Sequence, residues 1–82
     1  MNPESSRASR ILASFPRGPK SLTRVSLDEF KGRSFMNVRL WFMAPDGAWR
    51  PTRRGATFAV DELHDLQRAV QEAIQRTLGG KG

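Results

Sequence analysis

The chain has 82 residues, fourteen basic and eight acidic side chains, and a formal net charge of +6. It contains no cysteine and one histidine, which excludes a disulfide framework, a thiolate metal site and a cluster of histidine metal ligands. A small basic domain most often binds a polyanion, with nucleic acid ahead of an acidic membrane surface, and the alternative is a merely soluble basic protein.

The first twenty residues, MNPESSRASRILASFPRGPK, are rich in Ser, Pro, Gly and Arg and show no hydrophobic period. Such a composition is typical of a flexible segment. We therefore expect a flexible basic arm over residues 1–20, which either adds nonspecific phosphate contacts or acts only as a solubilising tail. A folded domain is expected over residues 21–79, with a short tail over residues 80–82.

Four short strands are expected after the arm. Residues 21–29 alternate in polarity, with Val25 and Leu27 on the apolar side, which predicts a half-buried strand. Lys31 and Gly32 predict a tight hairpin turn. The next strands are expected at residues 34–43, 48–50 and 56–60, separated by a type I turn at 44–47 and a second turn at 52–55. Pro51 is expected either to end the third strand or to confine it to an edge of the sheet.

The strand over residues 34–43 carries large side chains on both of its faces. One face has Met36, Val38, Leu40 and Phe42, and the other has Phe35, Asn37, Arg39, Trp41 and Met43. Neither face is purely polar, which is normal for a sheet that binds something on each side.

A long helix is predicted over residues 61–78, because apolar residues recur there at helical spacing and Gly79 and Gly80 follow. A chain of this size buries little apolar surface by itself. We therefore expect a homodimer that pairs through the helix, while simple packing of the helix on its own sheet is the alternative. The expected interface residues are Leu63, Leu66, Val70, Ala73 and Ile74.

Charge separates the predicted sheet from the predicted helix. Residues 24–54 contain seven basic and three acidic side chains, whereas residues 60–82 contain three basic and four acidic ones. Aromatic residues are interspersed among the basic residues from Phe30 to Gly55. Since arginine and lysine bind phosphates and flat rings stack on unpaired bases, the sheet is predicted to bind single-stranded nucleic acid.

The order of these elements and several short motifs resemble the positive cofactor four family, which are transcriptional coactivators that bind single-stranded DNA. The resemblance covers residues 24–73, and its landmarks are VS at 25–26, DEFKGR at 28–33, NVR at 37–39, WFM at 41–43, PDG at 45–47, RPTRRG at 50–55, and Leu63 and Leu66. It implies an α+β fold with a curved four-stranded antiparallel sheet and one C-terminal helix. It also implies a homodimer joined through the helices, with one channel for a single strand on each sheet.

The family's binding positions correspond to Phe30, Lys31, Arg33, Arg39, Phe42, Arg50, Arg53 and Arg54. The family usually has Trp at the position of Phe42, and here Trp41 precedes it. Strict alternation puts Trp41 with Arg39, whereas the resemblance favours Phe42 as the ring that faces DNA, turned outward by a β-bulge. The family often has a capping Asn where this chain has Ala59, so Asp61 is expected to cap a helix that starts slightly later.

No nucleophile, general base, phosphate loop or metal site is found, so we expect neither an enzyme nor a cofactor. The single histidine, His64, is expected to be exposed, and Trp49 to be a packing residue. No apolar run approaches the about twenty residues of a membrane span. We therefore expect an intracellular protein, in the cytoplasm or nucleoid of a bacterium or in the nucleus of a eukaryote.

The predicted function is nonenzymatic binding of single-stranded or melted DNA with little sequence preference. The predicted role is transcription regulation, and the transcription machinery is a candidate partner. The alternatives are a protein-interaction module that docks acidic segments of transcription proteins, and an RNA-binding protein that uses the same sheet.

Overall fold

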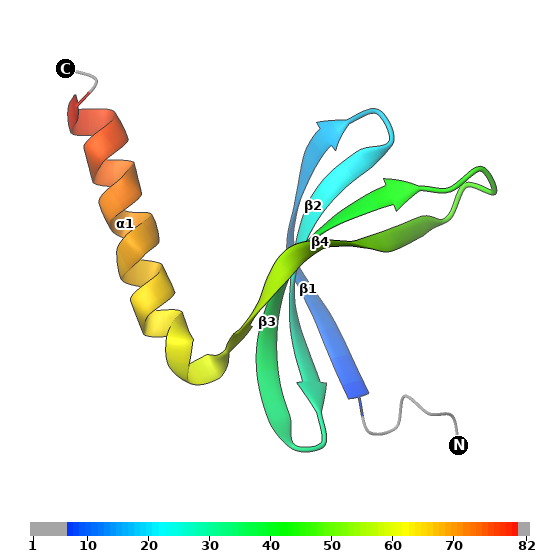
Figure 1. Cartoon of the computed structure of the whole chain (residues 1–82), viewed down its shortest axis with the longest axis horizontal. Coiled ribbons are helices and arrows are strands. Elements are labelled where there is room, and N and C mark those ends of the chain that lie inside the picture. The colour runs from blue at the N-terminus through cyan, green and yellow to red at the C-terminus, as the bar shows by residue number, and fades with distance from the viewer. Residues whose placement is uncertain (1–6, 81–82) are drawn as a thin grey trace.

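The computed structural model describes residues 7–80. Its elements are β1 (Arg7–Gly18), β2 (Ser21–Phe30), β3 (Arg33–Met43), β4 (Trp49–Ala59), the 3-10 helix η2 (Val60–Glu62) and α1 (Leu63–Gly80). The strands form one antiparallel sheet in the order β1-β2-β3-β4, and Figure 1 shows that this sheet is strongly twisted and curved. The expected fold class, a four-stranded antiparallel sheet followed by one long helix, is therefore confirmed.

The prediction of a flexible arm is wrong for residues 7–18, because these residues form β1 and pair with β2 from Arg7 opposite Phe30 to Gly18 opposite Ser21. The pairing shifts register between Ile11 and Ala13 and again between Pro16 and Gly18. Each shift changes which residues face the same side, and this hides the two-residue period that would identify a strand. Residues 1–6 of the expected arm, and residues 81–82 of the expected tail, lie outside the described residues.

The expected third and fourth strands are one continuous strand, β4. Pro51 does not end it but lies opposite Trp41, which an edge strand allows. Between the pairs Trp41–Pro51 and Arg39–Gly55, β3 has one residue and β4 has the three residues 52–54. The expected turn at 52–55 is therefore a bulge within a strand, where β4 has two more residues than β3 between the flanking pairs.

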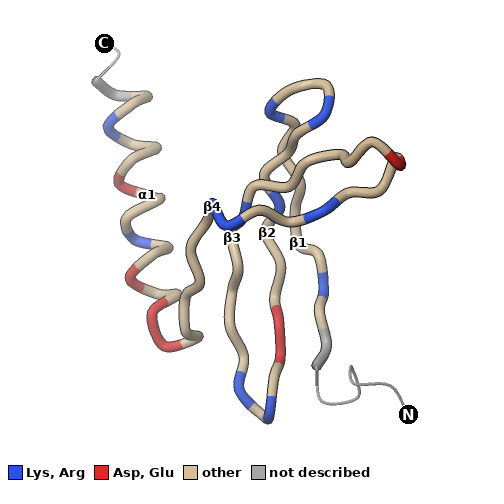
Figure 2. Tube along the Cα trace, turned by 45° about the vertical axis from the view of Figure 1, so that its right-hand side comes forward, with Lys and Arg blue, Asp and Glu red and all other residues tan. Residues whose placement is uncertain are grey.

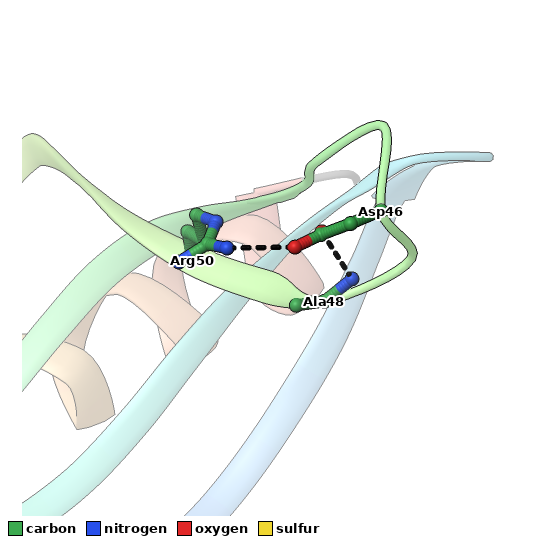
Figure 3. Close-up of polar contacts among 3 residues, drawn as sticks. All are labelled: Asp46, Ala48 and Arg50. Atoms are coloured by element: carbon green, nitrogen blue, oxygen red, sulfur yellow. Dashed lines mark hydrogen bonds and ion pairs between the residues drawn. The ribbon is translucent and has the colours of Figure 1, made fainter.

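The turns expected at Lys31–Gly32 and at residues 44–47 are both present. Lys31 and Gly32 have φ values of 55° and 78°, as a type I′ hairpin requires. In the second turn the Gly47 amide donates to the Ala44 carbonyl at 2.8 Å. Asp46 stabilises this turn: its carboxylate accepts from the Ala48 amide at 3.0 Å and pairs with Arg50 at 2.8 Å (Figure 3).

The sheet has two chemically different faces, because residues paired across antiparallel strands lie on the same side. On the first, the groove face, Arg24 lies opposite Arg39 and Ser26 lies opposite Asn37. The second, the apolar face, contains chiefly Val25, Leu27, Met36, Val38, Leu40 and Phe58.

The helix begins late, as expected, but not through Asp61. The 3-10 turn η2 comes first, and the Glu62 carboxylate reaches back to accept from the Ala59 amide at 2.8 Å. This bond satisfies one of the free backbone donors that precede α1.

The helix α1 extends away from the sheet (Figure 1), and its substantial contacts are confined to η2. Val70 and Ile74 stay open to solvent, with 50% and 44% of their surface exposed, whereas Leu63 and Leu66 near the start of the helix are half-buried. Among the described residues only Ala44 is buried. The Cα radius of gyration is 15.5 Å, whereas a compact chain of this length would have about 12 Å. A single chain therefore has no closed hydrophobic core, and the alternative of a helix packed on its own sheet is not observed.

No helix within residues 7–80 combines the length and the hydrophobicity needed to cross a membrane.

Candidate nucleic-acid interface

A groove of about 730 Å³ crosses the groove face of the sheet. This volume is in the range of known ligand sites. All four strands contribute to its lining, which consists of Ser9, Arg24, Ser26, Asp28, Asn37, Arg39, Trp41, Pro51, Thr52 and Arg53. Three arginines and one tryptophan thus share one concave surface with a single carboxylate.

That carboxylate, Asp28, is held by three neighbouring side chains. It accepts hydrogen bonds from the Ser9 hydroxyl at 2.7 Å, the Ser26 hydroxyl at 3.1 Å and the Asn37 amide at 3.2 Å. These donors come from β1, β2 and β3. Asp28 therefore ties three strands together on the floor of the groove.

Arg39 is oriented by the same network. Its Nε donates to the Asn37 side-chain oxygen at 3.1 Å, and its Nη1 donates to the Thr52 carbonyl at 3.1 Å. The Thr52 hydroxyl in turn donates to the Leu40 carbonyl at 2.8 Å and accepts from the Arg54 amide at 3.1 Å. The bulge of β4 thus supplies the acceptor that holds Arg39 across the groove.

Gly55 allows β4 to pass closely over β3 at this point. A Cβ atom on Gly55 would lie 2.3 Å from the Val38 carbonyl oxygen and 2.8 Å from the Arg39 Cα. Both are backbone atoms, which cannot move independently of the strand. Glycine is therefore needed for the close approach that puts Thr52 within reach of Arg39.

Arg24 stacks on Trp41 at one end of the groove. The guanidinium carbon lies 4.4 Å from the centre of the indole ring, which is a close cation–π contact. The two residues come from neighbouring strands and from adjacent positions on the groove face, since Trp41 pairs with Leu22 and Arg24 pairs with Arg39.

A basic hairpin tip, consisting of Phe30, Lys31 and Arg33, lies at the end of β2 and the start of β3. Phe30 and Arg33 are paired across the strands on the groove face, and all three side chains are exposed. The Lys31 amine lies 5.2 Å from the centre of the Phe30 ring. Figure 2 shows basic residues at this tip and at the β1–β2 turn, acidic residues on η2, and residues of both charges along α1. The net positive charge is therefore on the sheet, because η2 and α1 together have more acidic than basic side chains.

The residues predicted as binding positions are divided between the two faces. Arg39, Trp41 and Arg53 line the groove, and the basic hairpin tip lies on the same face. Phe42 and Arg50 are paired with each other on the opposite face, and Arg50 is held by Asp46. Arg54 also lies away from the groove, beside Arg17, Thr23 and Leu40 in a shallow hollow.

The bulge that would turn Phe42 toward Arg39 is not present in β3. This strand pairs with β2 without a shift from Ser21–Phe42 to Phe30–Arg33, so alternation is strict and Trp41 is the ring on the groove face. The irregularity lies in β4 instead.

Sequence reasoning did not assign a role to Arg24, Ser26, Asp28, Asn37 or Thr52. The alternation of residues along β2 could have identified the first three, because it puts them on the face of the strand that does not carry Val25 and Leu27. Thr52 had no signal, because its role depends on a backbone carbonyl in the bulge.

Within the described part of the chain, no three His, Cys, Asp or Glu residues are grouped so that they could hold a metal ion.

The family model for Transcriptional Coactivator p15 (PC4) matches residues 19–69 of the chain. Among solved structures, a PC4 homologue from Burkholderia pseudomallei is similar in its tetragonal crystal form, with a TM-score of 0.72 and 24% sequence identity over 80% of this chain and 97% of that one. Its orthorhombic form gives the same TM-score and identity over 83% of this chain and 92% of that one.

The bacteriophage T5 homologue of the eukaryotic coactivator PC4, implicated in recombination-dependent DNA replication, has a TM-score of 0.59 and 23% identity over 92% of this chain and 80% of that one. At these identities the likenesses establish the fold. Comparison with curated protein sequences gives no match.

Proposed function

Because the chain belongs to the family of Transcriptional Coactivator p15 (PC4), we propose that it is a nonenzymatic protein that binds single-stranded DNA with little sequence preference. The observation that carries this proposal is the groove, where Arg24, Arg39 and Arg53 surround Trp41 on one face of the sheet. The biological use would be transcription regulation or the handling of exposed single strands, since the phage homologue is implicated in DNA replication.

The affinity would come mainly from phosphate contacts. Arg39 and Arg53 in the groove and Lys31 and Arg33 at the hairpin tip can each bind a backbone phosphate and release condensed counterions. Arg39 is already oriented by Asn37 and Thr52, so it loses little side-chain freedom on binding.

The preference for single strands would come from the aromatic residues. Phe30 and Trp41 lie on the groove face, and stacking of a base on such a ring contributes about 1–3 kcal/mol. Duplex DNA has its base faces covered by neighbouring base pairs, so this contribution is available only in melted or single-stranded regions.

We propose that the functional unit is a homodimer. Val70, Ile74 and Leu78 of α1 are open to solvent, and a second copy of the chain would cover them and supply the core that one chain lacks. The proposed contact residues are Leu63, Leu66, Val70, Ala73 and Ile74.

A titration of labelled mixed-sequence DNA tests the proposed function, with single-stranded, bubble-containing and duplex forms and a single-stranded RNA at one stated salt concentration. If two bases stack at the lower estimate, the single strand should bind at least about tenfold more tightly than the duplex. Equal affinity for single strand and duplex would refute the stacking model and leave only a basic surface.

Two variants make the titration specific for the groove. Arg39→Gln should weaken binding to the single strand, because it removes an oriented groove cation. Arg68→Gln removes the same charge from an exposed position on α1 and should bind as the wild type does. An acidic peptide added as a competitor tests the alternative that the sheet docks acidic protein segments. Displacement of the DNA at a low peptide concentration would favour that alternative over DNA binding.

A further inference from the structure

Arg24 is a basic residue of the groove that the predicted binding set did not include. Its guanidinium carbon lies over the Trp41 ring, 4.4 Å from the ring centre. Its Nε atom is buried and has no hydrogen-bond partner. Buried donors are nearly always paired, because an unpaired one loses its hydration without compensation. The position therefore lacks an acceptor.

The charge around Arg24 is also uncompensated. Arg24 lies directly opposite Arg39 on the neighbouring strand, and like charges in such a pair repel each other. None of the ion pairs within residues 7–80 involves either arginine. The groove carboxylate, Asp28, is four residues further along β2, which corresponds to about 13 Å between Cα atoms. It already accepts three hydrogen bonds, one of them from Asn37, and it is linked to Arg39 only through Asn37.

We infer that Arg24 and Arg39 together form a subsite for one phosphate group of the bound strand. This inference rests on the proposed function and names a position that the family resemblance did not supply. An anion between the two guanidiniums would remove their repulsion. Because Nε is buried in the free protein, the Arg24 side chain must shift toward the groove before the anion can also serve as the missing acceptor. Within the lining of the groove, Arg24 and Arg39 lie directly opposite each other, and neither of them is in an ion pair.

The geometry of both side chains suits a phosphate. An arginine has five N–H donors in one plane, so a guanidinium that stacks on a ring still directs its donors outward along its edges. Arg39 uses Nε and one Nη1 donor for Asn37 and Thr52, which leaves three donors for a ligand. Arginine forks bind the oxygens of a phosphate in pairs, which favours arginine over lysine at such a site.

Trp41 is then a positioning residue for Arg24. One face of its ring is covered by the guanidinium, so a base can stack only on the opposite face. Loss of the ring should therefore weaken the contact between Arg24 and the phosphate. A weaker phosphate contact reduces the slope of log K against log salt. A role in base stacking alone would leave the salt dependence unchanged.

The test uses the full chain and a labelled oligothymidine of twenty nucleotides, and the affinity is measured over a series of salt concentrations. Arg24→Gln should weaken binding about tenfold, the effect of one charged hydrogen-bonding contact, and reduce the slope of log K against log salt by about 0.7. Arg68→Gln is the matched control, because it removes one charge from a side chain that is 79% exposed on α1. Thermal melts of both variants verify that they are folded.

The outcomes separate the inference from the function on which it rests. If the wild type binds the oligonucleotide and Arg24→Gln binds it with the same affinity and slope as Arg68→Gln, the subsite is refuted and the proposed function stands. If the wild type binds no single strand, the proposed function itself fails, and the inference fails with it.

Two further measurements remain informative if Arg24→Gln is poorly folded. In the unaltered protein labelled with ¹⁵N, the Arg24 Nε–H resonance should shift on addition of the oligonucleotide, and an unmoved resonance would overturn the subsite. Trp41→Leu should reduce the salt slope by a similar amount, and combining it with Arg24→Gln should give no further reduction. Additive reductions would mean that the ring does not act through Arg24.

Discussion

Replacement of Gly55 by alanine tests whether the close passage of β4 over β3 builds the groove. The new Cβ would lie 2.3 Å from the Val38 carbonyl oxygen and 2.8 Å from the Arg39 Cα, so one strand must move away from the other. Such overpacking costs about 1–3 kcal/mol. The smaller freedom of alanine in the unfolded chain offsets about 0.4–1 kcal/mol of this cost. At the midpoints of these ranges, the net loss is about 1.3 kcal/mol.

Thermal unfolding at a fixed protein concentration measures this loss. For a domain of this size, 1 kcal/mol corresponds to a decrease in Tm of about 4–8 °C. The matched control is Gly18→Ala, because Gly18 has no positive φ and a Cβ there would meet only the Ser21 hydroxyl, a side-chain atom that can move, at 3.2 Å. The control should melt close to the wild type.

The same substitution should also weaken binding of single strands. Displacement of β4 moves the Thr52 carbonyl, which accepts the hydrogen bond from Arg39. A Gly55→Ala protein that melts like the wild type and binds DNA equally well would refute the account of the close approach.

Three further predictions follow from the two faces of the sheet and from the helix. Trp41→Ala should reduce single-strand affinity by about 1–3 kcal/mol, whereas Phe42→Ala should lower the melting temperature more than the affinity; the opposite pattern in paired melts and titrations would restore Phe42 as the DNA-facing ring. Ile74→Asp should dissociate or unfold the proposed dimer, because a buried carboxylate without a partner is costly; light scattering that gives the same mass as the wild type would contradict the proposed helix interface. Arg53→Ala should flatten the salt dependence more than Arg50→Ala, since Arg53 lines the groove and Arg50 does not; equal slopes would show that the groove is not the phosphate site.

Much of the groove could be predicted by counting residues. The two-residue turn at Lys31–Gly32 sets the register of β2 against β3, and this register puts Arg24 opposite Arg39. Alternation along β3 correctly separated Trp41 from Phe42. The family resemblance favoured Phe42 as the ring that faces DNA. A resemblance assigns a role to a position in the sequence, but it does not show to which face of the sheet the side chain at that position points.

The parts that could not be predicted depend on irregular backbone. β1 has two register shifts, so its apolar residues Ile11 and Phe15 do not follow a single period. β4 contains Pro51 and a three-residue bulge, which on local grounds end a strand. Pairing with β2 and β3 outweighs these local signals, and only the assembled sheet reveals it.

The pairing of β1 with β2 has a consequence for truncated forms of the protein. A fragment that begins at residue 21, where the domain was expected to start, would remove the outer strand and leave the backbone donors and acceptors of β2 unpaired. An uncovered strand edge recruits other strands, so such a fragment should tend to aggregate. It would also lose Ser9, one of the three donors to Asp28. The shortest soluble form of this domain should therefore begin no later than Arg7.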